Sequence, residues 1–218
     1  MNICAIVPVK PLNRAKSRLS ESLAPAQREL LATGLLMRTT GLLLGLPCIQ
    51  KVLVISRDTK ALAMVRELGA HTVQESGAPE LNNALLRATQ VLRAWNSAAS
   101  IIVPADIPLL AAEDIEEVAH LGRFPNTVVL VPDRHEQGTN LLFVRPPGLI
   151  SYAYGEDSFG AHQAAARVVD ATVQIYRSPT AALDLDTPED LEQYYALAHQ
   201  LGQPAADWIL ELDQPGGL

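Results

Sequence analysis

Residues 52–74, VLVISRDTKALAMVRELGAHTVQ, place an apolar run, an amphipathic stretch and a short run with β-branched residues in direct succession. The first run, Val52–Ser56, is apolar at nearly every position, which is typical of a strand buried on both faces of a parallel sheet. Thr59–Leu68 has the periodicity of a helix, and His71–Gln74 is expected to form the next strand. These residues therefore predict a βαβ unit and an α/β fold.

The same alternation continues on both sides of this unit. Further strands are expected at Ile3–Pro8, Ser100–Pro104, Thr127–Pro132, Asn140–Val144 and Thr172–Tyr176. Further helices are expected at Ala26–Leu46, Asn82–Trp95, Ala112–Leu121 and Pro188–His199. We predict one domain over residues 1–202, with βαβα order throughout and a mostly parallel central sheet, followed by a C-terminal tail over residues 203–218.

Composition narrows the class of protein. A chain of 218 residues with 48% hydrophobic content can bury a full core, and its net charge of −7 argues against nucleic acid or an anionic membrane as the main partner. No apolar run is long enough to span a bilayer, and no basic segment precedes the first apolar run, so we expect a cytoplasmic protein. Cys4 and Cys48 lack the spacing of a metal or redox motif and are expected to be reduced thiols.

Cations gather in the loop that follows the first strand. Four of them stand within nine residues, namely Lys10, Arg14, Lys16 and Arg18. The loop contains no glycine, which excludes a Walker loop and a dinucleotide fingerprint, because both need backbone N–H groups to approach phosphate closely. Lysine and arginine side chains would then neutralise a bound phosphate. A solvated basic loop explains the cluster equally well at this point.

Asp106 follows an apolar strand and is flanked by Pro104 and Pro108. The prolines restrict the backbone and remove two hydrogen-bond donors, which fixes the orientation of the carboxylate. A hard divalent cation that bridges phosphate oxygens takes one or two such carboxylates. The alternative is an aspartate that caps the following turn, and we favour the metal.

A second group of carboxylates precedes the last helix. In an extended segment successive side chains alternate, so Asp184 and Asp186 point to one side while the leucines between and before them pack inward. Two carboxylates on one side repel each other unless a cation joins them, although compensation of a helix dipole is the alternative. Thr187 is expected to cap the helix, which gives Glu189 and Asp190 structural positions in its first turn.

Two further segments carry candidate ligands. Ser158 is expected to cap a helix that runs to Val169, and a helix N-terminus near Gly155 and Thr139 would bind a phosphate or carboxylate. Plain capping without a ligand is equally consistent with this segment. In Asn82-Asn83, one residue is expected to cap the following helix, and a side-chain amide there could also bind a purine edge.

Taken together, these segments resemble one family, the CofC/FbiD guanylyltransferases of coenzyme F-420 biosynthesis. The motifs that carry the resemblance are Val7–Leu12, Ala15–Leu19, Leu81–Leu85, Pro104–Leu109, Gly138–Asn140, Gly155–Ser158 and Leu183–Pro188. The resemblance covers the chain from Ile3 to about Leu191. It implies a glycosyltransferase-A-like, Rossmann-related nucleotidyltransferase fold and the transfer of GMP from GTP to a small phosphorylated acid, with release of pyrophosphate.

The resemblance also implies roles for individual residues. Mg²⁺ would be held by Asp106, Asp184 and Asp186. The phosphorylated acid would meet Thr139, Gly155 and Ser158. The nucleotide would meet Pro8, Val9, Lys10, Lys16, Arg18, Asn82 and Pro104, with Asn82 near the guanine. The residues expected to be catalytic are Lys10, Lys16 and Asp106.

Phosphoenolpyruvate is the acceptor that we expect, and 2-phospho-L-lactate or 3-phosphoglycerate are the alternatives. Within the same fold, a sugar-phosphate or molybdopterin nucleotidyltransferase is the rival enzyme, and the absence of a glycine-rich first loop argues against it. A nucleotide-binding regulatory module without catalysis is the rival from another class. The sequence leaves open whether the protein forms a homodimer.

Overall fold

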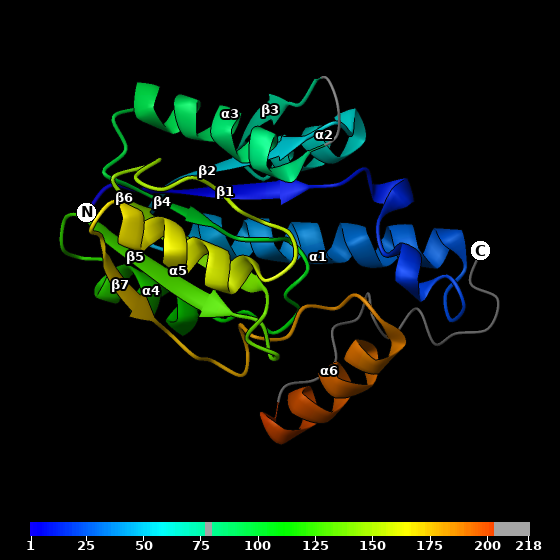
Figure 1. Ribbon diagram of the computed structural model, residues 1–218. Coiled ribbons are helices and arrows are strands. Elements are labelled where there is room, and N and C mark those ends of the chain that lie inside the picture. Colours follow the sequence, from blue (N-terminus) through cyan, green and yellow to red (C-terminus); the bar gives the residue numbers. More distant parts are fainter. Residues whose placement is uncertain (77–79, 203–218) are drawn as a thin grey trace.

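The computed structural model describes residues 1–76 and 80–202, and within them seven strands form one sheet in the order β3-β2-β1-β4-β6-β5-β7 (Figure 1). The strands are β1 (Ile3–Val9), β2 (Ile49–Ser56), β3 (His71–Gln74), β4 (Ala99–Ile102), β5 (Thr127–Pro132), β6 (Thr139–Arg145) and β7 (Thr172–Ile175). β6 is antiparallel to both of its neighbours, and the remaining pairs are parallel. The prediction of a mostly parallel α/β sheet is confirmed. The predicted tail lies outside the described residues.

The helices are α1 (Pro25–Gly45), α2 (Thr59–Glu67), α3 (Leu81–Ala94), α4 (Ala112–Leu121), α5 (Ser158–Val168) and α6 (Pro188–Gln200). Two short 3-10 helices, η1 (Leu12–Arg14) and η2 (Ser17–Leu19), shape the loop after β1 and were not expected from the sequence. Neither α1 nor any other helix within residues 1–76 and 80–202 combines the length and apolar character that a bilayer crossing requires.

The sheet is buried on both faces because apolar side chains occupy successive positions of its central strands. On β1, Ile3, Ala5 and Val7 pack on one face with the apolar sides of α1, α2 and α4. Cys4 and Ile6 pack on the other face with α3 and α5. Two layers of helices therefore enclose the sheet, which explains why its strands are apolar rather than alternating in sequence.

The expected βαβα order fails between β5 and β6, which form a hairpin. Asp133 closes its turn, since its backbone N–H donates to Gly138 at 3.0 Å and its carboxylate accepts from the backbone N–H of Gln137 at 2.9 Å. Because β6 runs antiparallel to β4, with Leu142 opposite Ile102, its amino end lies beside the carboxyl end of β4. This reversal brings Thr139 to the edge of the sheet where Asp106 follows β4.

A third apolar cluster attaches α6 to the rest of the protein. It joins the first half of α1 to the residues around α6 and consists of Leu19, Leu23, Leu31, Leu35, Leu109, Leu183, Leu185, Tyr194 and Ala198. Figure 1 shows α6 outside the helical layers that cover the sheet. The backbone N–H of Leu185 donates to the carbonyl of Asp106 at 2.9 Å. The segment that leads into α6 is thereby fixed against the loop after β4.

Candidate active site

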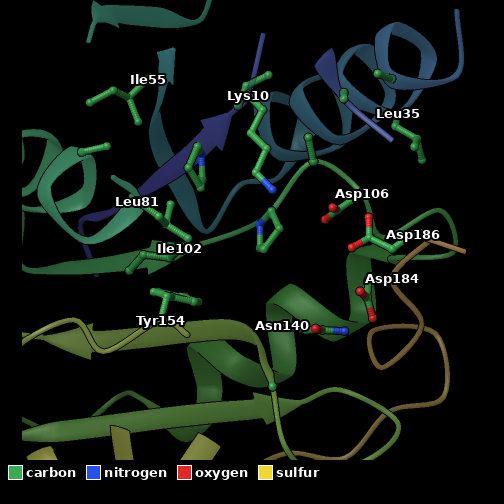
Figure 2. A pocket seen from close by; sticks show the side chains of 18 of the residues that line it. Lys10, Leu35, Ile55, Leu81, Ile102, Asp106, Asn140, Tyr154, Asp184 and Asp186 are labelled. Carbon is green, nitrogen blue, oxygen red and sulfur yellow. The ribbon is translucent and has the colours of Figure 1, made fainter. Parts of the chain in front are cut away.

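A cavity of about 530 Å³ lies at the carboxyl ends of β1, β2, β4 and β5 and the amino end of β6 (Figure 2). This is the edge at which open α/β sheets bind ligands. The predicted site residues that line the cavity are Pro8, Val9, Lys10, Lys16, Pro104, Asp106, Thr139, Gly155, Ser158, Asp184 and Asp186. The structure thus brings together residues that lie up to 178 positions apart in the chain.

Lys16 is the buried cation of the loop after β1. Its side chain is only 6% exposed, and its Nζ lies 3.0 Å from Asp106 Oδ2 and 2.9 Å from Asp186 Oδ1. The backbone of Lys16 is left-handed, with φ at 55°, which is an unfavourable conformation for a lysine. Leu12 and Leu19, both buried, anchor the loop on either side of it. A solvated basic loop is therefore the wrong description of Lys16.

The charged groups of this cluster shift one another's pKa values. Burial alone would lower the pKa of Lys16, but the carboxylates of Asp106 and Asp186 outweigh it and raise the pKa. Burial alone would raise the pKa of Asp186, but the Lys16 ammonium outweighs it and the pKa is lowered. Lys16 and Asp186 are therefore both charged at neutral pH. Figure 2 shows Lys10 extending into the same part of the cavity from β1.

The pKa of Asp184 is shifted in the opposite direction to that of Asp186. Burial, followed by the negative charges of Asp106 and Asp186, raises the pKa of Asp184 to about 6. Leu183 and Leu185 are buried in the cluster that holds α6, so the predicted alternation of this segment is confirmed. The raised pKa of Asp184 therefore reflects its burial first and the two neighbouring carboxylates second.

These carboxylates are suited to a divalent cation. Among the described residues, no three His, Cys, Asp or Glu side chains are arranged around one point as a metal site, and Lys16 Nζ lies between Asp106 and Asp186. However, the group is acidic, opens into the cavity, and offers the hard oxygen ligands that Mg²⁺ takes together with several waters. A cation there would also relieve the carboxylate repulsion that adds to the effect of burial on the pKa of Asp184. The metal role of the three aspartates stays a prediction.

The opposite wall of the cavity comes from the start of β6 and of α5. The prediction that Ser158 caps α5 is wrong by one residue: Asp157 is the N-cap, and its carboxylate accepts from the backbone N–H of Gly160 at 3.3 Å. Aspartate caps as well as serine and tolerates the left-handed φ of 48° that the chain adopts there. Ser158 is left to accept from the backbone N–H of Thr139 at 2.9 Å, which ties the two cavity residues together.

The first turn of α6 is held as the sequence predicts. Thr187 caps the helix, and one carboxylate oxygen of Asp190 accepts from the backbone N–H groups of Asp186 and Thr187 at 2.9 and 2.7 Å. The other oxygen pairs with Arg134 at 2.8 Å. Asp190 therefore fixes the backbone beside Asp186 without lining the cavity.

Two predicted residues, Arg18 and Asn82, do not line the cavity. The side chain of Arg18 is 75% exposed and lies 3.9 Å from Asp186. The amide of Asn82 is occupied by the backbone of Tyr154, to which it donates at 3.1 Å and from which it accepts at 2.9 Å. Neither Asn82 nor Asn83 caps α3, because the helix begins at Leu81 with Glu80 in the N-cap position. Asn82 instead holds Tyr154 in the cavity wall.

Comparison with known proteins identifies the family. The family model described as guanylyl transferase CofC like matches residues 3–213. This chain belongs to the CofC-like guanylyl transferases. A phosphoenolpyruvate guanylyltransferase of Rubrobacter xylanophilus is 36% identical over 90% of this chain and 95% of its own. A 2-phospho-L-lactate guanylyltransferase of Methanothermobacter thermautotrophicus is 34% identical over 97% of this chain and 92% of its own.

Solved structures support the same fold for this CofC-like protein. A provisionally assigned nucleotide-diphospho-sugar transferase from Desulfovibrio desulfuricans G20 superposes with a TM-score of 0.73 at 16% identity, covering 91% of this chain and 88% of its own. A 4-diphosphocytidyl-2C-methyl-D-erythritol synthase superposes with a TM-score of 0.62 at 11% identity, covering 90% of this chain and 98% of its own. The fold is thus the glycosyltransferase-A-like nucleotidyltransferase fold, as expected.

The CofC-like cavity also contains residues that the sequence did not single out as ligands. Among them are Glu75, Glu80, Leu81, Asn140 and Tyr154. Glu75 directly follows β3, so the rule that ligands lie beyond the carboxyl ends of strands could have found it. Tyr154 could not have been found this way, because its place in the wall depends on the long-range contact with Asn82.

Proposed function

We propose that this CofC-like protein transfers GMP from GTP to phosphoenolpyruvate and releases pyrophosphate. One observation carries the proposal: a single cavity contains a buried lysine between two aspartates on one wall and the start of a helix on the facing wall. The wall with Lys16 and the aspartates suits a nucleoside triphosphate with its metal, and the wall at the start of α5 suits a small anion. Membership of the guanylyl transferase family supports the same reaction.

The nucleotide would lie along β1 and the loop after it. Lys10 and Lys16 supply positive charge for the phosphates, and Lys16 is already held in place by Asp106. Farther along the cavity the lining becomes apolar, with Ile55, Leu81, Ala84 and Ile102 suited to a flat base. The carboxylates of Glu75 and Glu80 also line the cavity. A carboxylate accepts from the ring N–H and amino group that guanine presents, which favours GTP over ATP.

The acceptor would lie at the start of α5. Phosphoenolpyruvate carries a phosphate and a carboxylate, and the N-terminus of a helix favours anions. Thr139 and Ser158 offer hydroxyl groups there, and Gly155, with φ at 153°, offers backbone that only glycine adopts readily. Among eight similar relatives, six are named phosphoenolpyruvate guanylyltransferase and two 2-phospho-L-lactate guanylyltransferase, which supports phosphoenolpyruvate as the acceptor.

The reaction is an in-line displacement at the α-phosphorus of GTP. An oxygen of the acceptor's phosphate forms the new P–O bond, while the bond to the β-phosphate breaks and pyrophosphate leaves with the electron pair. The acceptor phosphate is anionic at neutral pH, so no general base is required. Lys10 and Lys16 position the triphosphate and offset its charge.

Asp106, Asp184 and Asp186 would hold Mg²⁺, which supplies further charge neutralisation at the phosphates when bound. Binding of the cation would also require Lys16 to share the two carboxylates that it contacts here. We place the reaction in the cytoplasm, where the free thiols of Cys4 and Cys48 would stay reduced.

A matrix of substrates tests the proposal. Pyrophosphate release is measured with GTP, ATP or CTP against phosphoenolpyruvate, 2-phospho-L-lactate or 3-phosphoglycerate, with Mg²⁺ present. The highest kcat/KM is expected for GTP with phosphoenolpyruvate. Preference for CTP would instead favour an activity like that of the 4-diphosphocytidyl-2C-methyl-D-erythritol synthase that shares the fold. Turnover without any acid would contradict guanylyl transfer to an acid.

A further inference from the structure

A histidine that the proposed mechanism does not use lies behind the cavity wall that Thr139 and Ser158 form at the starts of β6 and α5. His162 is fully buried on α5, and both of its ring nitrogens are within hydrogen-bond distance of a partner. Nε2 lies 3.0 Å from the backbone nitrogen of Ala153, and Nδ1 lies 3.0 Å from Oγ1 of Thr139. The ring of Tyr154 meets it edge-on at 4.8 Å. His162 therefore connects the backbone beside the cavity to a hydroxyl that lines it.

These contacts determine where the proton of the imidazole lies. A backbone N–H can only donate, so Nε2 of His162 must accept from Ala153 and carries no proton. Burial lowers the pKa of His162 to about 4, so the ring is neutral at pH 7 and has one N–H. That N–H is at Nδ1 and donates to Thr139.

The direction of this hydrogen bond leaves the Thr139 proton free. A hydroxyl has one proton, and that of Thr139 cannot point at an Nδ1 that already carries one. Within residues 1–76 and 80–202 the hydroxyl of Thr139 has no other hydrogen-bond partner. The hydroxyl proton of Ser158 is likewise not used in its contact with Thr139, because Ser158 Oγ accepts from the backbone N–H of Thr139. Both hydroxyl groups accept from the protein and can donate into the cavity.

We propose that His162 is a positioning residue that fixes the Thr139 hydroxyl as a hydrogen-bond donor to the acceptor substrate. The inference rests on the proposed function in taking that substrate to be the phosphorylated acid. A donor at this place selects for a ligand with an anionic oxygen and against one with an amide N–H there, since two donors would face each other. His162 thus contributes to the choice of a deprotonated acid without touching it.

The protonation state is tested without any activity. The full-length protein is labelled with ¹⁵N in its histidines, and the His162 signals are assigned by their absence in His162→Gln. At pH 7 we expect a protonated-type shift for Nδ1 and an unprotonated-type shift for Nε2. The reverse tautomer, or a doubly protonated ring, would overturn the proposal whether or not the protein transfers GMP.

A double-mutant cycle tests the effect on the substrate. Thr139→Val removes the hydroxyl at nearly constant volume and should raise the KM for the acid by roughly 10- to 100-fold while leaving the KM for GTP unchanged. His162→Phe should raise the same KM in the presence of Thr139 but by less than about twofold in the Thr139→Val background. His162→Gln, whose amide has both a donor and an acceptor, should have a KM closer to that of the wild type.

Equal effects of His162→Phe in both backgrounds would mean that His162 acts on the fold and not through Thr139, which refutes the proposal. If His162→Phe does not fold, the cycle is run with His162→Leu, which also lacks any hydrogen-bonding group, and the same criterion applies. A wild-type protein that turns over no acid would instead refute the proposed function, and the tautomer measurement would still decide the state of His162.

Discussion

Acidification should destabilise this protein through His162. The ring is neutral in the folded protein because burial lowers its pKa from 6.5 to about 4. In the unfolded chain the ring takes up a proton at its ordinary pKa, so below pH 6.5 the unfolded state binds more protons than the folded state. The stability that depends on the neutral ring is therefore complete above pH 6.5 and is lost as the pH falls towards 4.

The size of the effect follows from the two pKa values. A difference of one pKa unit corresponds to about 1.4 kcal/mol, so the full shift is equivalent to roughly 3 kcal/mol. At pH 5 the folded ring is still mostly neutral, and the loss relative to pH 7.5 is about 2 kcal/mol. The neighbouring Tyr154 does not compensate for this loss, because burial raises its pKa and keeps it neutral over the whole range.

Urea denaturation measures this loss. The free energy of unfolding is determined between pH 7.5 and 5 for the wild type and for His162→Gln, which cannot titrate but keeps polar groups at the same place. Other groups titrate equally in both proteins, so the difference between the two curves isolates His162. We expect the wild type to lose about 2 kcal/mol relative to the variant on acidification. Parallel curves would refute the assignment of a buried neutral imidazole.

Three substitutions test other parts of the account. Lys16→Met should lower kcat/KM for GTP by roughly 10³-fold in the pyrophosphate assay while circular dichroism stays unchanged; activity within a few-fold of the wild type would contradict its role. Asp157→Ala removes the cap of α5 and should lower the free energy of unfolding by about 1 kcal/mol in urea. Gly122→Ala would place its Cβ 2.2 Å from the ring of the buried Phe143 and should lower the free energy of unfolding by about 1–3 kcal/mol, measured as a lower Tm. An unchanged Tm would mean that the Phe143 ring can move aside without loss of packing.

Much of the fold could be predicted because burial and periodicity are local properties of the sequence. The strand His71–Gln74 and the helix Ala112–Leu121 occur with the expected bounds. The start of β2 at Ile49 was missed because Gln50 and Lys51 are polar; Lys51 pairs with Cys4 of β1, while the register of the two strands shifts at Gln50. The antiparallel direction of β6 was missed because an apolar run has the same pattern in either direction, although residues 133–138 are too few for the crossover that parallel strands require.

The candidate site was predictable where position along a strand determines it. Asp106 follows the carboxyl end of β4, and the rule for open sheets brings such residues to one edge. Thr139 reaches the same edge only because β6 runs antiparallel to β4. The burial of Lys16 was not predictable, because it depends on two aspartates from distant segments and on a left-handed backbone. The place of the α5 cap was not predictable either, since aspartate and serine cap equally well and Asp157 precedes Ser158 directly.

The central claim is that this cavity joins GMP to a phosphorylated acid with the help of its aspartates. ³¹P NMR follows GTP, phosphoenolpyruvate and Mg²⁺ with the wild type and with Asp106→Asn, which keeps the volume of the side chain but removes its charge. With the wild type we predict loss of GTP, equal amounts of pyrophosphate and a new phosphoanhydride that forms only when the acid is present, and with Asp106→Asn almost none of these. Near-normal turnover by Asp106→Asn, or conversion of GTP to GMP without incorporation of the acid, would contradict the account.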